Sequence, residues 1–143
     1  MSTLERAIEI AVKAHAGQID KAGEPYILHP LRLMFAVNGT YPRMAAVLHD
    51  VVEDTSVTID NLKAEGFPAE VIEAVQALTK QKGESRIEAA KRASENSISK
   101  AVKLADVTDN MDITRIQQPT EKDYLRLKEY EQVRALLLSH GTI

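Results

Sequence analysis

The sequence contains no cysteine, which excludes disulfide bonds and thiolate metal sites. Tryptophan is also absent, and aromatic residues make up only 4% of the 143 residues. The core must therefore be built mainly from aliphatic side chains. The lack of thiols is typical of a cytoplasmic protein, and the cytoplasm is the location we expect.

The chain also lacks long apolar runs and dense basic runs. Its apolar segments are far shorter than the roughly 20 residues that a membrane-spanning helix needs. The first residues, MSTLERAIEI, are acidic and amphipathic, so we expect no signal peptide. The formal net charge of −3 argues against nucleic-acid binding. We therefore expect neither a membrane nor a nucleic acid as a partner.

The remaining composition is that of a globular domain, with 44% hydrophobic and 27% charged residues. A chain of this length can bury a substantial core as one domain. Helical patterns follow one another along the chain, and there is no β-alternation, internal repeat or interdomain linker. The sequence thus predicts an all-α fold, a single compact helical bundle over residues 1–143.

Local signals predict where the helices begin and end. Ser2, followed by Glu5 three residues later, forms a capping box for the first helix. Two glycines and two prolines make residues 17–30 a long loop that includes His29. Further helices are predicted at residues 31–37, from 42 through LHDVVED, and at 58–66, 68–80, 86–94, 97–111 and 119–139.

Four titratable residues crowd into LHDVVEDT, at residues 48–55, where the preceding pattern is that of a buried helix. On one continuous helix, His49 would stand over Glu53 and Asp50 over Asp54, because residues four apart share a face. Imidazole and carboxylate groups are good ligands for divalent transition metals. His49 and Asp50 could therefore bind one ion, although solvated charges at a helix end would give the same pattern.

Two distant residues strengthen the metal interpretation. His29 is stiffened by the proline that follows it in YILHP. Asp106 lies in KLADVTDNMD, on a helix with an apolar face, where an unpaired buried carboxylate would be costly. Taken singly, His29 is a packing or surface residue and Asp106 a cap or a partner of Lys103. With His49 and Asp50, however, they form a set suited to manganese or iron that leaves room for water and substrate.

Four segments resemble, in this order, the motifs of HD-domain metal-dependent phosphohydrolases: HAGQIDKAGEPYILHP, LHDVVEDT, ALTK and KLADVTDNM. More narrowly, they look like the alarmone-hydrolase branch found in RelA/SpoT-type proteins and their short single-domain relatives. The likeness runs from about His15 to Asn110 and more weakly to RLKEY at residues 126–130. It implies an all-helical HD-domain bundle that releases pyrophosphate from the 3′ position of guanosine tetra- or pentaphosphate.

The resemblance also implies a cofactor and residue roles. The cofactor would be one divalent metal ion, with manganese as first choice and iron, cobalt or zinc as alternatives. Its ligands would be His29, His49, Asp50 and Asp106. The residues that handle the attacking water would be Glu53 and Asp54. The residues that contact a nucleotide or phosphorylated metabolite would be Lys21, Asn110, Arg126 and Tyr130.

The chain departs from the family pattern around the expected pocket. Asp20 stands where the family has an arginine that packs on the guanine base. After KLAD, the chain reads VTDNMDI where relatives read RLHNMRT, which adds Asp109 and Asp112 and places Ile113 where a hydroxyl contacts the nucleotide. Fewer basic groups should weaken the binding of a highly phosphorylated ligand.

Two alternatives to the alarmone hydrolase therefore stay open. One is a phosphohydrolase that acts on another nucleotide or phosphorylated metabolite. The other is a non-catalytic module that senses a metal or a nucleotide.

Residues outside these motifs carry smaller expectations. His15 continues a helical stripe and should be a core histidine, whereas His140 in the C-terminal tail should be exposed. The basic residues of EAAKRASENSISK should form a solvated face. In the C-terminal helix, a stripe should belong to the core, with its surplus available for a homo-oligomer contact; it consists of Leu125, Leu127, Val133, Leu136 and Leu137.

Overall fold

The computed structural model describes residues 2–139, so His140 lies outside the described residues. Within that range the chain forms nine α-helices and one short 3-10 helix, without a β-strand. The predicted all-α class is therefore confirmed. The helices have these bounds: α1 Leu4–Ala14, α2 Leu28–Ala36, α3 Thr40–Leu48, α4 Val51–Asp54, α5 Ile59–Ala64, α6 Ala69–Leu78, α7 Arg86–Ala93, α8 Ser97–Asn110, η1 Ile113–Arg115 and α9 Glu121–Ser139.

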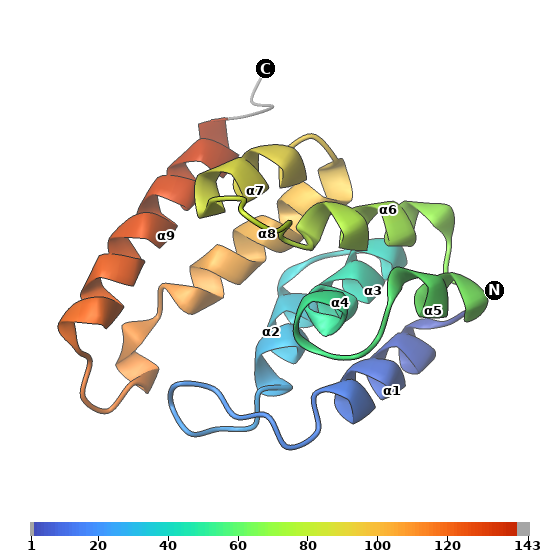
Figure 1. The fold of residues 1–143 in the computed structure, drawn as a ribbon, viewed down its shortest axis with the longest axis horizontal. Helices are drawn as coiled ribbons and strands as arrows, with labels where there is room; N and C mark the ends of the chain where they lie inside the picture. Colours follow the sequence, from blue (N-terminus) through green and yellow to red (C-terminus); the bar gives the residue numbers. More distant parts are fainter. Residues whose placement is uncertain (1, 140–143) are drawn as a thin grey trace.

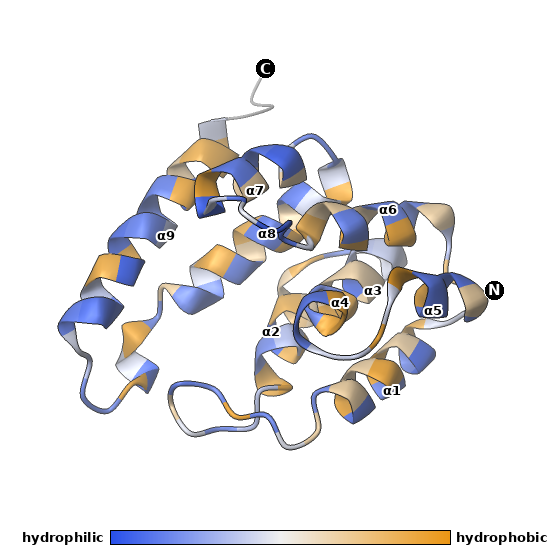
Figure 2. Ribbon diagram, viewed as in Figure 1, coloured by the Kyte–Doolittle hydropathy of each residue, from blue (hydrophilic) through white to orange (hydrophobic). Residues whose placement is uncertain are grey.

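Helix α3 lies at the centre of the bundle, in contact with α1, α2, α6 and α8 (Figure 1). Its five consecutive residues from Met44 to Leu48 are all buried, as expected for a helix that is covered on every side. Helices α7, α8 and α9 enclose a second, smaller core that contains Val107, Val133 and Leu137. Hydrophilic segments separate the hydrophobic residues of α9 (Figure 2). None of the described helices has the length and apolar character needed to cross a membrane.

Two predicted helix starts are wrong. Thr3, not Ser2, caps α1: its side chain accepts a hydrogen bond from the Arg6 backbone N–H at 3.1 Å. Helix α2 begins at Leu28, so His29 lies in its first turn rather than in a loop. The proline that follows His29 is tolerated because backbone N–H groups in a first helical turn have no partner within the helix.

The helix predicted through LHDVVED is broken. Helix α3 ends at Leu48 and α4 begins at Val51, with Asp50 at φ −108° and ψ −1°. The expected stacking of His49 over Glu53 is therefore wrong. On a continuous helix, adjacent side chains diverge by about 100°. The break instead allows His49 Nε2 and Asp50 Oδ2 to approach within 2.9 Å.

The outcome for the smaller expectations is mixed. His15 is 1% exposed and belongs to the interior, as predicted. Leu125 is 59% exposed, so its assignment to the core is wrong. Val133 and Leu137, in the C-terminal half of α9, are buried, so the prediction is confirmed for these two residues of the stripe.

The basic residues of α7 were predicted to be solvated, and for Arg92 this prediction is wrong. Its guanidinium donates to the backbone carbonyls of Gln76, Ala77 and Thr79 at 2.9–3.1 Å, at the end of α6. It also pairs with Glu84 at 2.8 and 3.0 Å. Arg92 thus satisfies carbonyl groups that a helix end leaves without partners, and it joins α6, the following loop and α7.

We expect Arg92→Ala to lower the free energy of unfolding by about 2 kcal/mol, because several charge-assisted hydrogen bonds are lost together. Chemical denaturation measures this change, and Lys91→Ala, which removes an exposed neighbouring cation, is the control. Equal effects of the two substitutions would show that Arg92 is an ordinary surface residue.

Candidate metal centre and binding cleft

Two histidines and one aspartate are buried together where α2, α3 and α8 meet. His29, His49 and Asp106 are 5%, 2% and 9% exposed. One ligand atom from each lies within 4.8 Å of the other two. Charged groups are rarely buried unless they are paired or bind a metal, so this cluster requires a specific explanation.

Three of the four predicted ligands, His29, His49 and Asp106, form one group, and Asp50 adjoins it through His49. His29 Nε2 is 2.9 Å from Asp106 Oδ1, and His49 Nε2 is 3.7 Å from the same oxygen. Asp50 Oδ2 approaches His49 Nε2 to 2.9 Å. Atoms of the types that bind divalent metals thus gather around the Nε2 atom of His49.

The hydrogen bonds of the two imidazoles fit a metal. His49 Nδ1 lies 2.8 Å from the Ala46 carbonyl oxygen, and His29 Nδ1 lies 2.6 Å from Asp109 Oδ2. Each ring can therefore donate its Nδ1–H outward and present Nε2 to the shared centre. His49 Nε2 is buried and, although Asp50 Oδ2 lies 2.9 Å away, it forms no hydrogen bond of suitable geometry among residues 2–139. Histidines that bind metals commonly have this arrangement.

The charges in the cluster stabilise one another. Burial opposes a charge on His49, but Asp50 and Asp106 outweigh it and raise the pKa of His49 well above its usual value. Burial likewise disfavours charge on Asp106, yet Lys103 and the two histidines hold the pKa of Asp106 well below its usual value. Lys103 Nζ lies 3.2 Å from Asp106 Oδ2, so the simple ion pair considered from the sequence exists within the larger cluster.

The acidic residues of α4 stand beside this cluster. Carboxylate oxygens of Asp50, Glu53 and Asp54 lie within 4.8 Å of one another. Glu53 accepts a hydrogen bond from the Lys80 backbone N–H at 2.6 Å. Burial and, to a smaller extent, repulsion from Asp50 and Glu53 raise the pKa of Asp54 to about 6. The two acids therefore differ: Glu53 is tied to the loop after α6, whereas Asp54 can exchange a proton near neutral pH.

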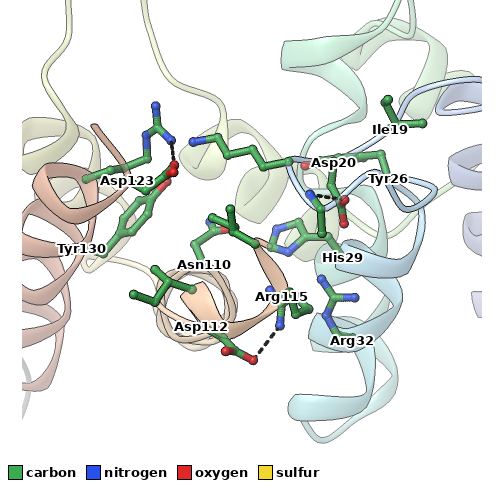
Figure 3. A pocket seen from close by; sticks show the side chains of 15 residues that line it. Ile19, Asp20, Tyr26, His29, Arg32, Asn110, Asp112, Arg115, Asp123 and Tyr130 are labelled. Carbon is green, nitrogen blue, oxygen red and sulfur yellow. Dashed lines mark hydrogen bonds and ion pairs between the residues drawn. The ribbon is translucent and has the colours of Figure 1, made fainter. Parts of the chain in front are cut away.

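Two adjoining cavities open onto the cluster. One, of about 260 Å³, is lined by the four predicted metal ligands and by Glu53 and Asp54. The other, of about 390 Å³, is lined by all four predicted substrate contacts, namely Lys21, Asn110, Arg126 and Tyr130. In Figure 3, Tyr130 lies across this second cavity from His29, and Asn110 lies between them. His29 and Asn110 line both cavities, so the cavities are adjacent, and we refer to the two together as the cleft.

Tyr26 is a site residue that the sequence reasoning missed. Its hydroxyl donates a hydrogen bond to Asp50 Oδ2, and its ring lies 4.9 Å from that of His15. Burial and the nearby Asp50 carboxylate raise the pKa of Tyr26, so the phenol keeps its proton. The sequence did contain one signal for Tyr26: it precedes His29 by three residues, a spacing that places two side chains on the same side of a helical turn.

Asp20 has a role in the loop that the sequence did not indicate. Its Oδ1 accepts hydrogen bonds from the backbone N–H groups of Ala22 and Glu24, both at 2.9 Å. Asp20 lines the cavity, but this oxygen closes the turn of the loop before α2.

The pocket contains more basic groups than the sequence analysis expected. Arg32 and Arg115, which the sequence analysis did not single out, also line the cavity. Arg32 Nε lies 2.8 Å from Asp109 Oδ1, and Arg115 Nη1 lies 3.0 Å from Asp112 Oδ2. The added carboxylates are therefore paired with arginines.

A family model for the HD domain matches residues 7–132. The chain belongs to the HD domain family. The match includes all four proposed metal ligands and confirms the resemblance drawn from the motifs.

The HD chain is similar to longer bacterial proteins. It is 34% identical to a "probable GTP pyrophosphokinase" of Mycobacterium leprae, over 96% of this chain and 19% of that protein. It is 42% identical to a guanosine-3′,5′-bis(diphosphate) 3′-pyrophosphohydrolase of Haemophilus influenzae, over 56% of this chain and 13% of that protein. The chain thus spans less than a fifth of the length of these relatives.

A solved structure shows the same fold. It is described as a metazoan ortholog of SpoT that hydrolyzes ppGpp and plays a role in starvation responses. The TM-score is 0.78 at 23% identity, and the match covers 98% of this chain and 87% of the other. The HD fold of this chain therefore extends over nearly its whole length.

We expect divalent metal binding to release protons and to strengthen as pH rises. Burial would lower the pKa of His29, but hydrogen bonds with Asp106 and Asp109 outweigh it and raise the pKa, as Asp50 and Asp106 do for His49. The raised pKa values favour the protonated rings, so a metal must displace their protons. Calorimetric titration with Mn²⁺ in buffers of different ionisation enthalpy counts the released protons, and a pH-independent affinity without proton release would contradict this expectation.

Proposed function

We propose that the protein is a metal-dependent phosphohydrolase, with guanosine 3′,5′-bis(diphosphate) as the leading substrate and the 3′-pyrophosphate as the group released. The observation that carries this proposal is the gathering of two imidazole Nε2 atoms and two carboxylates at the base of a cleft. The names of the relatives, including the pyrophosphohydrolase of Haemophilus influenzae, support the choice of substrate.

In this proposal, one divalent metal ion is held by His29, His49, Asp50 and Asp106. A mixed set of nitrogen and oxygen ligands suits manganese, our first choice, and also iron, cobalt or zinc. When bound, such an ion makes water more acidic and withdraws charge from a phosphoryl oxygen. Tyr26, through its hydrogen bond to Asp50, would fix the orientation of that carboxylate.

The acidic pair handles the proton in this mechanism. Asp54 accepts the proton of the attacking water, because a base works best when its pKa lies near the operating pH. Glu53, anchored by the Lys80 backbone N–H, holds α4 and its own carboxylate beside the reacting group.

The basic side chains around the cleft would bind the phosphates. Lys80, Arg86 and Lys103 line the metal cavity, while Lys21 and Arg126 line the neighbouring one. Cationic groups stabilise phosphate oxygens through charge-assisted hydrogen bonds. The Tyr130 ring and the amide of Asn110 would contact the nucleoside, and a cavity of about 390 Å³ lies within the usual range for small ligands.

A less phosphorylated nucleotide or another phosphorylated metabolite is the second candidate substrate. The observation that favours it is that arginines on the cavity wall are already paired with carboxylates, Arg115 with Asp112 and Arg126 with Asp123, which leaves less positive charge for additional phosphate groups. A purely sensing module would not need the acidic pair at the metal centre. We place the reaction in the cytoplasm, and the homo-oligomer that the sequence allows stays a prediction.

The direct test is a screen for phosphate and pyrophosphate release. We expect the purified protein with Mn²⁺ to convert the alarmone to a guanosine nucleotide and pyrophosphate, and to lose this activity with a chelator or with His49→Ala. Turnover of another nucleotide alone would select the second candidate, and metal binding without any turnover would select the sensing module.

The proton-transfer assignment predicts different effects for the two acids. Asp54→Asn should lower kcat by roughly 100-fold or more, the usual scale for the loss of a general base, while Mn²⁺ remains bound. Glu53→Gln should cost less, because its amide oxygen can still accept from Lys80. Steady-state kinetics at saturating Mn²⁺ measures both effects, and the opposite ranking would make Glu53 the base.

A further inference from the structure

Asp109 joins the metal centre to two arginines on the wall of the cleft. Its carboxylate is 12% exposed and lies against three basic side chains. Oδ2 is 2.6 Å from His29 Nδ1 and 3.0 Å from Arg32 Nη2, while Oδ1 is 2.8 Å from Arg32 Nε. Arg115 Nη2 approaches Asp109 Oδ2 to 3.4 Å and the Asp109 carbonyl oxygen to 2.9 Å.

We propose that Asp109 is a positioning residue for the metal centre: held by Arg32, it fixes the ring and the Nδ1 proton of His29 so that Nε2 faces the ion. The proposal rests on the metal site assigned above. It gives a function to a residue that, from the sequence, only added negative charge to the pocket.

The spacing on α8 explains how one helix controls both sides of the His29 ring. Asp106 and Asp109 are three residues apart and therefore share a face of the helix. Asp106 Oδ1 lies 2.9 Å from His29 Nε2, and Asp109 Oδ2 lies on the opposite side of the ring, at Nδ1. Residues of one helix thus supply both a candidate metal ligand and the acceptor that orients a second ligand.

The role requires a fixed carboxylate. An imidazole binds a metal through Nε2 only if its remaining proton is on Nδ1, and an acceptor at Nδ1 selects that tautomer. Arg32 reaches both oxygens of Asp109 with its rigid fork, which fixes the plane of the carboxylate. The corresponding acceptor for His49 is the main-chain carbonyl of Ala46, so Asp109 performs with a side chain what the backbone does for the other histidine.

The same contacts predict the effect of a nearly isosteric change. Asn at position 109 has one acceptor oxygen, while Arg32 and His29 together need acceptors at both positions. If the amide oxygen faces Arg32 Nε, the NH₂ group faces His29 and favours the wrong tautomer. If the oxygen faces His29, the NH₂ group opposes an Arg32 N–H. Either orientation weakens the metal centre.

The test is calorimetric titration of the whole protein with Mn²⁺ alone. Asp109→Asn should raise the Kd for Mn²⁺ by roughly 10- to 100-fold, the usual effect of losing such a partner. Asp112→Asn is the matched control, because it removes the same charge from a carboxylate that contacts Arg115 but neither histidine. The control should change the Kd by less than about threefold. If the two substitutions changed the Kd equally, Asp109 would act only through its negative charge, and the proposal would be overturned.

A spectroscopic readout separates positioning from a general loss of stability. In protein loaded with diamagnetic Zn²⁺, the Nδ1–H of His29 should give a far-downfield proton resonance that Asp109→Asn shifts upfield while the His49 resonance stays in place. If Asp109→Asn does not fold, Arg32→Gln provides a second test, because it keeps Asp109 but removes the guanidinium that holds both of its oxygens. This substitution should also raise the Kd for Mn²⁺, by a smaller factor. An unchanged Kd in the substituted protein would overturn the role of Asp109 alone, whereas a wild-type protein that binds no Mn²⁺ would overturn the metal site as well.

Discussion

The buried carboxylate of Asp106 is the constraint on which the rest of the structure depends. Removing a charge from water costs several kcal/mol unless nearby groups compensate for it. Here His29 Nε2, Lys103 Nζ and Asn110 Nδ2 lie 2.9, 3.2 and 3.1 Å from its oxygens. These contacts explain why helix α2 begins early enough to contain His29 and why α8 carries polar residues along a face that is otherwise apolar.

The break between α3 and α4 follows from the same requirement. A continuous helix would direct His49 and Asp50 to different sides, whereas the break brings Asp50 Oδ2 within 2.9 Å of His49 Nε2, which itself lies 3.7 Å from Asp106 Oδ1. It also leaves Glu53 and Asp54 at the rim of the cluster, where they experience different surroundings. The proposed ligands are therefore buried deepest, the proposed proton acceptor lies at their rim, and cationic side chains line the cavities beyond.

The fold class and the gathering of the proposed site residues were predictable because their signals are local. Helical periodicity predicted the all-α bundle, and four ordered motifs predicted the HD domain and the residues that gather in the cleft. The break after Leu48 was not predictable, because a tertiary need for charge pairing overrides a regular helical pattern. The contacts of Arg92, Asp109 and Tyr26 were equally hidden, since each has partners that are distant in the sequence.

The account's central claim is that His29, His49, Asp50 and Asp106 together bind one divalent metal ion. Crystals grown with Mn²⁺ and measured at the manganese absorption edge test it most directly. The account predicts one strong anomalous peak within about 2.0–2.2 Å of both Nε2 atoms and of oxygens from Asp50 and Asp106, the bond lengths usual for such ligands. A peak elsewhere, or a cluster whose side chains keep their mutual hydrogen bonds in the presence of Mn²⁺, would contradict it.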